Sequence, residues 1–126
     1  MLNSPKKQDT EIIKEDNIEV IVQDSVEVLK KGDKQGILIY NYSIGDLKDI
    51  RNKLLKYLYL SGFKEVRIIE VIKKGLISDF INGNSGHTYI LLDPFSIVNE
   101  KIKENFYSIN LDECMKMRLT RNKFLF

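Results

Sequence analysis

The residues of this sequence that could do chemistry follow segments predicted to be strands. They supply an amide, a hydroxyl, an ammonium and a carboxylate, carried by Asn41, Ser43, Lys73 and Asp93. In an open α/β sheet, ligands bind beyond the carboxyl ends of the strands. We therefore expect these four groups at one edge of a sheet, where together they could bind a phosphate or a metal-bound anion.

Simpler local roles explain the same four residues, and we favour them. Ser43 begins an S-x-x-D sequence, which is the spacing of a helix N-cap. Asp93 precedes a proline, a pair that is typical of a helix start. Asn41 is then a polar strand end, and Lys73 belongs to a solvated turn.

Nucleophilic and metal chemistry have few candidates in this chain. It contains one cysteine, Cys114, and one histidine, His87, so a Cys/His zinc site cannot be built within one chain. The acidic residues directly before Cys114 disfavour its thiolate. Residues 83–87, GNSGH, lack the spacing of a phosphate-binding loop and precede a strand, so we expect a plain turn. We predict no catalytic residue, no metal and no cofactor, and we favour a non-enzymatic protein.

A basic segment near the end of the sequence suggests a different function. Its cations are Lys116, Arg118, Arg121 and Lys123, and two phenylalanines follow them. Basic residues interleaved with aromatic residues can hold a nucleic-acid strand by charge and stacking. The same residues can equally form a solvated face that ends in an apolar plug, and no standard RNA-binding motif accompanies them.

Residues 36–63 form the unit around which the rest of the chain is organised. The apolar run 37–40 predicts a strand that is buried on both faces. A helix is predicted after Ser43, and Gly62 is placed to end it. The apolar positions of this helix recur at helical spacing: Leu47, Ile50, Leu54 and Leu58.

Strand and helix patterns alternate along the remaining chain. Further strands are predicted at 18–22, 65–72 and 89–92, and short helices at 25–32 and 76–81. A longer helix is predicted after Asp93, with its apolar positions at Ile97, Val98, Ile102 and Phe106. The segment from Asn110 fits a helix or a strand, and propensity favours the helix. This alternation predicts an α/β fold with a mainly parallel sheet of about four strands and helices packed on it.

The predicted helix after Ser43 is more apolar than a helix on a sheet requires. Its additional apolar residues are Leu55, Tyr57, Tyr59 and Leu60. A sheet-covering helix needs an apolar stripe only a little wider than about 100°. The surplus is expected either to be covered by the C-terminal segment or to contact another molecule, including a second copy of the chain.

Composition limits the class of protein. The 126 residues fit one domain, assigned to 17–126, preceded by a flexible tail over 1–16 that has little apolar content. A net charge of +2 gives no argument for nucleic acid. No run of 18 apolar residues predicts a membrane span, and a single cysteine permits no internal disulfide. We expect a cytoplasmic protein.

Two resemblances rest on the same stretch. GILIYNYSIGDLKDIRNKLLKYLYLSGF and the later YILLDPFS resemble the first half of a response-regulator receiver domain. That resemblance implies a phospho-acceptor at Asp93 and a metal-binding acidic pair at Asn41 and Tyr42, neither of which is acidic here. Residues 36–107 are also similar to small uncharacterised bacterial α/β domains. This second resemblance, which we prefer, implies a fold and no activity.

Three functions are therefore open at this point. The favoured one is a non-enzymatic regulatory or protein-interaction module that acts through the surplus apolar face and self-associates. The first alternative is a nucleic-acid-binding protein that uses the basic C-terminal segment. The second alternative is a degenerate receiver-like or phosphate-binding domain.

Overall fold

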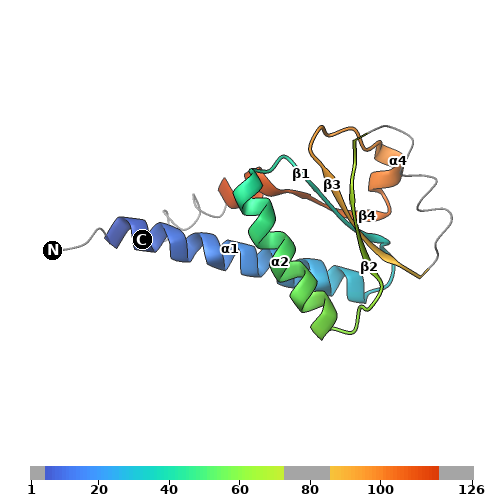
Figure 1. The fold of residues 1–126 in the computed structure, drawn as a ribbon, viewed down its shortest axis with the longest axis horizontal. Coiled ribbons are helices and arrows are strands. Elements are labelled where there is room, and N and C mark those ends of the chain that lie inside the picture. Colours follow the sequence, from blue (N-terminus) through green and yellow to red (C-terminus); the bar gives the residue numbers. More distant parts are fainter. Residues whose placement is uncertain (1–4, 73–85, 117–126) are drawn as a thin grey trace.

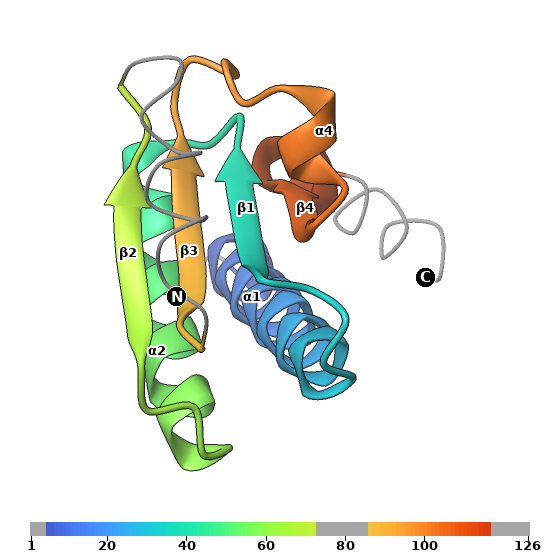
Figure 2. The same cartoon turned by 90° about the vertical axis from the view of Figure 1, so that its right-hand side faces the viewer.

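Four parallel strands form the sheet at the centre of the molecule. The computed structural model describes the backbone of residues 5–72 and 86–116, and the side chains within these ranges from residue 17 onward. The strands are β1 (Gly36–Tyr40), β2 (Val66–Glu70), β3 (Thr88–Asp93) and β4 (Phe106–Asn110). Their spatial order is β2-β3-β1-β4, and every neighbouring pair is parallel (Figure 2). The predicted α/β class with a mainly parallel sheet of about four strands is confirmed.

A long helix, α1 (Pro5–Lys30), precedes the sheet and extends far beyond it (Figure 1). The predicted strand at 18–22 is therefore wrong, and the predicted short helix at 25–32 is the end of α1. Ile18, Val22 and Leu29 are buried at helical spacing. The buried positions therefore follow the 3.6-residue period of a helix, although the apolar residues at 18–22 also alternate as in a strand. Residues 5–16, assigned to a flexible tail, have helical backbone, and residues 1–4 lie outside the described range.

Helix α2 (Ile44–Leu60) follows β1 as predicted. The Ser43 side chain caps it by accepting a hydrogen bond from the Asp46 N–H. The helix buries Ile50, Leu54 and Leu58 against the sheet. Gly62 has φ +95°, a left-handed conformation that glycine adopts without strain and that ends the helix.

Two apolar layers lie on opposite faces of the sheet. Helices α1 and α2 cover one face, where they pack on Ile37, Ile39 and Ile90 (Figure 2). The other face carries Leu38 and Leu91, which pack with Val98 and with residues near the short helix α4 (Glu100–Lys103). Alternate residues of each central strand therefore serve different layers, as a strand buried on both faces requires.

Helix α1 also contributes to the cover of part of the surplus apolar surface of α2. Leu55 and Tyr57 are partly buried against the core cluster to which α1 contributes. The Tyr57 hydroxyl donates to Glu19 Oε1 of α1 at 2.5 Å, and Lys53 pairs with Glu19 Oε2 at 3.2 Å. The sequence predicts that the C-terminal segment or another molecule covers these residues of α2. It does not predict a contribution from α1, because the residues of α1 are interpreted there as a tail, a strand and a short helix.

The chain between β3 and β4 differs from the predicted long helix. The backbone at 94–99 is irregular, α4 spans only four residues, and its N-cap is Asn99. Ser96 has φ +52°, which no α-helix contains. Phe106, predicted on the helix, instead begins β4, a strand that the sequence interpretation missed.

The segment after β4 is helical over 111–116, as favoured from the sequence. Leu111 and Met115 are buried in the same cluster as α1 and α2. The Asn17 side chain of α1 donates to the Met115 carbonyl at 3.4 Å, so this segment packs on α1. Residues 117–126 and the helix predicted at 76–81 lie outside the described residues.

Candidate functional site

The carboxyl ends of the strands meet at one edge of the sheet, because all four strands run in the same direction (Figure 2). Three of the four predicted polar residues, Asn41, Ser43 and Asp93, lie there. Asn41 and Ser43 follow β1, and Asp93 ends the neighbouring strand β3. Lys73 lies outside the described residues.

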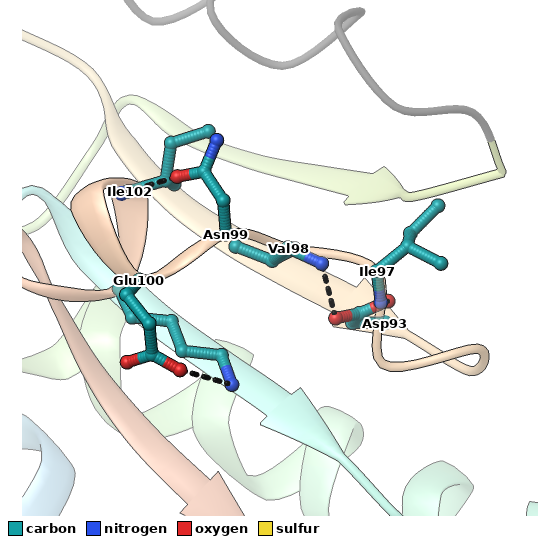
Figure 3. A network of polar contacts seen from close by, with 7 residues as sticks. Asp93, Ile97, Val98, Asn99, Glu100 and Ile102 are labelled. Carbon is teal, nitrogen blue, oxygen red and sulfur yellow. Dashed lines mark hydrogen bonds and ion pairs between the residues drawn. The ribbon is translucent and has the colours of Figure 1, made fainter.

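Asp93 is completely buried and holds the chain that follows it. The Ile97 N–H donates to its Oδ1 at 2.9 Å, and the Val98 N–H donates to its Oδ2 at 3.0 Å (Figure 3). Both carboxylate oxygens therefore stabilise the irregular segment 94–98. No helix begins at Pro94, so the predicted helix cap at Asp93 is wrong; its carboxylate holds an irregular segment, and the helix α4 is capped by Asn99.

Asn41 connects the end of β1 to the end of β4. Its Nδ2 donates to Asn110 Oδ1 at 2.9 Å, and the Asp112 N–H donates to the Asn41 carbonyl at 2.8 Å. Asn110 in turn donates to Glu113 Oε2 at 3.0 Å. Asn41 adopts φ +53°, a conformation that asparagine tolerates better than most residues. Its side chain and carbonyl thus support the local structure.

Two carboxylates, those of Glu70 and Asp93, lie near Tyr42 at this edge. Burial raises the pKa of the Tyr42 phenol above its usual value, and the nearby carboxylates of Glu70 and Asp93 raise this pKa further. Tyr42 is therefore neutral at physiological pH. Of the two carboxylates, only that of Glu70 is exposed to solvent.

Large apolar side chains are exposed at the same edge. Ile44, Ile72 and Phe95 are exposed to 84%, 60% and 67% respectively. They lie shortly after β1, β2 and β3, which are adjacent in the sheet order β2-β3-β1. We call these three residues the edge surface. Exposed apolar residues that lie together are a common mark of a protein–protein interaction site.

The edge surface was missed from the sequence. Its members are single apolar residues in turns or at a helix start, outside any periodic pattern. The available signal was an apolar residue just beyond each of three strands. Recognising that they belong together required the strand order, which places the ends of β2, β3 and β1 side by side.

The four residues of the predicted interaction face on α2 differ in their exposure. Leu55 and Tyr57 are partly buried against the core, whereas Tyr59 and Leu60 are 63% and 73% exposed at the end of the helix. They lie near the amino end of β2, because only a short turn separates α2 from that strand. This pair is therefore separate from the edge surface.

The basic segment proposed for nucleic acid is only partly described. Lys116 Nζ pairs with Asp112 Oδ2 at 3.1 Å, one helical turn away. Arg118, Arg121 and Lys123 lie outside the described residues. Lys116 therefore serves a local ion pair on an exposed helical turn.

Neither a metal site nor a reactive role for His87 is supported by the described residues. His87 lies before β3, at the opposite edge from Asp93, with its Nε2 3.5 Å from Glu65 Oε2. Its ring packs edge-on against Tyr89. Among the residues that the structure describes, no group of three or more His, Cys, Asp or Glu side chains could hold a metal ion.

Comparison with known proteins found no matching family model, no matching curated protein and no matching solved structure. None of the helices in the described part of the chain is long and apolar enough to span a bilayer.

Proposed function

We propose that this chain is a non-enzymatic, regulatory protein-interaction module that binds a partner protein at the edge surface. One observation carries the proposal: three large apolar side chains are 60–84% exposed at the ends of three adjacent strands. Burying such side chains in an interface contributes about 1.5–3 kcal/mol each. An apolar side chain that fills a pocket on the partner can act as an anchor of the interface.

The polar residues at the same edge support binding better than catalysis. Both oxygens of Asp93 accept backbone hydrogen bonds, and Asn41 bridges β1 and β4. A phospho-acceptor carboxylate must instead present an oxygen to the incoming phosphoryl group. The strand order supports the same view, because flavodoxin-like sheets have the order 2-1-3-4-5, whereas here β3 lies between β2 and β1.

The partner that fits this edge presents apolar side chains flanked by Lys or Arg. The apolar groups match Ile44, Ile72 and Phe95. A basic group would pair with the exposed carboxylate of Glu70, which lies near Tyr42 at this edge. We also propose a cytoplasmic location, since a lone cysteine suits a reducing compartment.

Site-specific crosslinking in cells tests the proposed surface. A photoreactive amino acid replaces Phe95, and in a control chain it replaces Gln23, which is exposed on α1. We expect a discrete adduct from position 95 that position 23 does not give, and that disappears when Ile44→Asp is added. The crosslinked protein is then purified and its binding to the chain is measured by calorimetry.

In that binding experiment, Phe95→Asp is expected to weaken the affinity by about tenfold or more, as a central apolar anchor does. Gln23→Asp serves as the matched control and leaves the affinity unchanged. Identical adducts from positions 95 and 23, or equal affinity for both variants, would show that the edge surface is not the interface.

A further inference from the structure

The strand β2 lies at the edge of the sheet, so one side of its backbone has no strand partner among the described residues. The Thr88 N–H donates to the Glu65 carbonyl, and the Val71 N–H donates to the Leu92 carbonyl, each at 2.8 Å. Residues 65, 67, 69 and 71 therefore direct their backbone groups toward β3. Val66, Ile68 and Glu70 direct theirs outward, available to another strand.

The side chains of β2 make this edge suitable for pairing. Val66 packs in the layer of α1 and α2, so Ile68 and Glu70 point to the same face by strand alternation. Ile68 is 38% exposed there, and Tyr59 and Leu60 are exposed at the end of α2. The edge contains no proline, and no described strand or helix occupies its outer side, so two of the protections that exposed strands commonly have are missing.

We propose that a second copy of this chain pairs with β2 in the antiparallel direction, so that two sheets form one continuous sheet. The two-fold axis passes between the Arg67 residues of the two copies. Val66 then lies opposite Ile68 of the second copy, and Lys64 lies opposite its Glu70. On the face of α2, the apolar pair and the ion pair are each formed twice by symmetry, so two apolar pairs are flanked by two ion pairs.

Neighbouring registers are less complementary. A shift by two residues in one direction places Val66 opposite Glu70, and in the other direction it places Lys64 opposite Ile68. A shift by one residue places the outward-facing backbone groups of one copy opposite residues of the other copy whose backbone groups are already bonded to β3, so the inter-strand hydrogen bonds cannot form. In the proposed register, the like charges of the two Arg67 residues meet on the other face. Glu65 of the second copy lies diagonal to each Arg67, within reach of its long side chain.

This interface is independent of the proposed partner surface, since it uses the outer side of β2 instead of the carboxyl ends of the strands. Charge reversal tests it directly. Lys64→Glu places two glutamates opposite each other, and Glu70→Lys places two lysines opposite each other. An equimolar mixture of the two variants restores both ion pairs in a heterodimer. Lys31→Glu and Glu104→Lys, both exposed elsewhere, are the matched controls.

Native mass spectrometry and sedimentation at low salt give the readout, because exposed charges are screened within about 10 Å at 0.1 M salt. We expect the wild-type chain at twice the 14.7 kDa of one copy. Each single reversal weakens the dimer by roughly tenfold, the mixture restores it as a heterodimer, and the controls leave it unchanged.

Proline substitution gives a second test that does not depend on charge. Ile68→Pro removes an outward N–H and is expected to abolish the dimer while the monomer stays folded. Ile69→Pro removes an N–H that faces β3 and is expected to destabilise the monomer itself. A strictly monomeric wild-type chain at high micromolar concentration overturns the proposal. So does a dimer that survives both charge reversals or Ile68→Pro.

Discussion

At the scale of single residues, Glu19 joins the two helices that cover the same face of the sheet. Its carboxylate accepts from the Tyr57 hydroxyl and pairs with Lys53. The hydrogen bond from Tyr57, and next the one from Lys53, lower the pKa of Glu19 below its usual 4.5. The same hydrogen bond raises the pKa of Tyr57 above 10.

The contribution of Glu19 to the free energy of unfolding should therefore decrease at acidic pH. A carboxyl group whose pKa is lowered by folding stabilises the folded state above its unfolded pKa, and this contribution is lost as the pH falls through the folded pKa. Urea unfolding of the wild-type chain and of Glu19→Gln from pH 6 to pH 2 measures it. We expect the advantage of the wild type at pH 6 to shrink below about pH 4.5. Parallel stability profiles for the two chains would contradict this assignment.

The buried carboxylate of Asp93 belongs to the same scale. Asp93→Asn keeps one acceptor oxygen and leaves one of the two backbone N–H groups of Ile97 and Val98 unsatisfied. An unsatisfied buried donor costs about 1–3 kcal/mol in the free energy of unfolding. Asp93→Ala removes both acceptors and should cost more. The exposed Asp49, replaced by Asn, is the control, with an expected change below about 0.5 kcal/mol. Chemical denaturation checks the order, and equal stability of all three variants would refute it.

At the scale of elements, Gly36 controls how closely the two central strands approach. A Cβ atom at Gly36 would lie 1.8 Å from the Tyr89 carbonyl oxygen of β3, so any side chain would separate β1 from β3. We expect Gly36→Ala to destabilise the fold by about 3 kcal/mol or more. Gly45, in the first turn of α2, has nothing within 4 Å of the equivalent position. Gly45→Ala should stabilise the protein slightly, by up to about 1 kcal/mol. Thermal unfolding distinguishes the two, and similar melting temperatures would contradict the close approach.

The elements also show what the sequence could and could not predict. Strands β1, β2 and β3 and helix α2 were predicted because their apolar periods, the Ser43 cap and the Gly62 stop all agree. Helix α1 was misassigned because Ile18, Val20 and Val22 alternate like a strand, although the positions buried in the fold follow the helical period. β-Branched residues favour strands locally, and the packing of a helix against α2 overrode that preference.

Neither strand β4 nor the edge surface could be predicted from local patterns in the sequence. β4 is five residues long, with Tyr107 and Ile109 facing one layer and Phe106 the other, so only two of its residues show the alternation of a strand. The edge surface depends on which strands are neighbours. That information lies in contacts between distant parts of the chain, whereas caps and turns lie within a few residues.

At the scale of the whole molecule, two apolar layers share one sheet. Leu54 is fully buried in the layer of α1 and α2, and Leu91 is fully buried in the layer of α4. Because β1 and β3 contribute to both layers, we expect Leu54→Ala and Leu91→Ala each to cost about 2–5 kcal/mol. Both should lower the midpoint of the same single unfolding transition. Circular dichroism and tyrosine fluorescence check this, and a transition that splits in either variant would show two independently folding units.

The strand order has a consequence for how the protein is made. β1 is synthesised early, yet both strands that flank it, β3 and β4, come much later in the chain. During translation β1 lacks β3 until residue 93, and β4 until residue 110, has left the ribosome. Exposed strands of this kind favour aggregation and slow folding. The nascent chain is therefore expected to depend on chaperones until β4 has been synthesised.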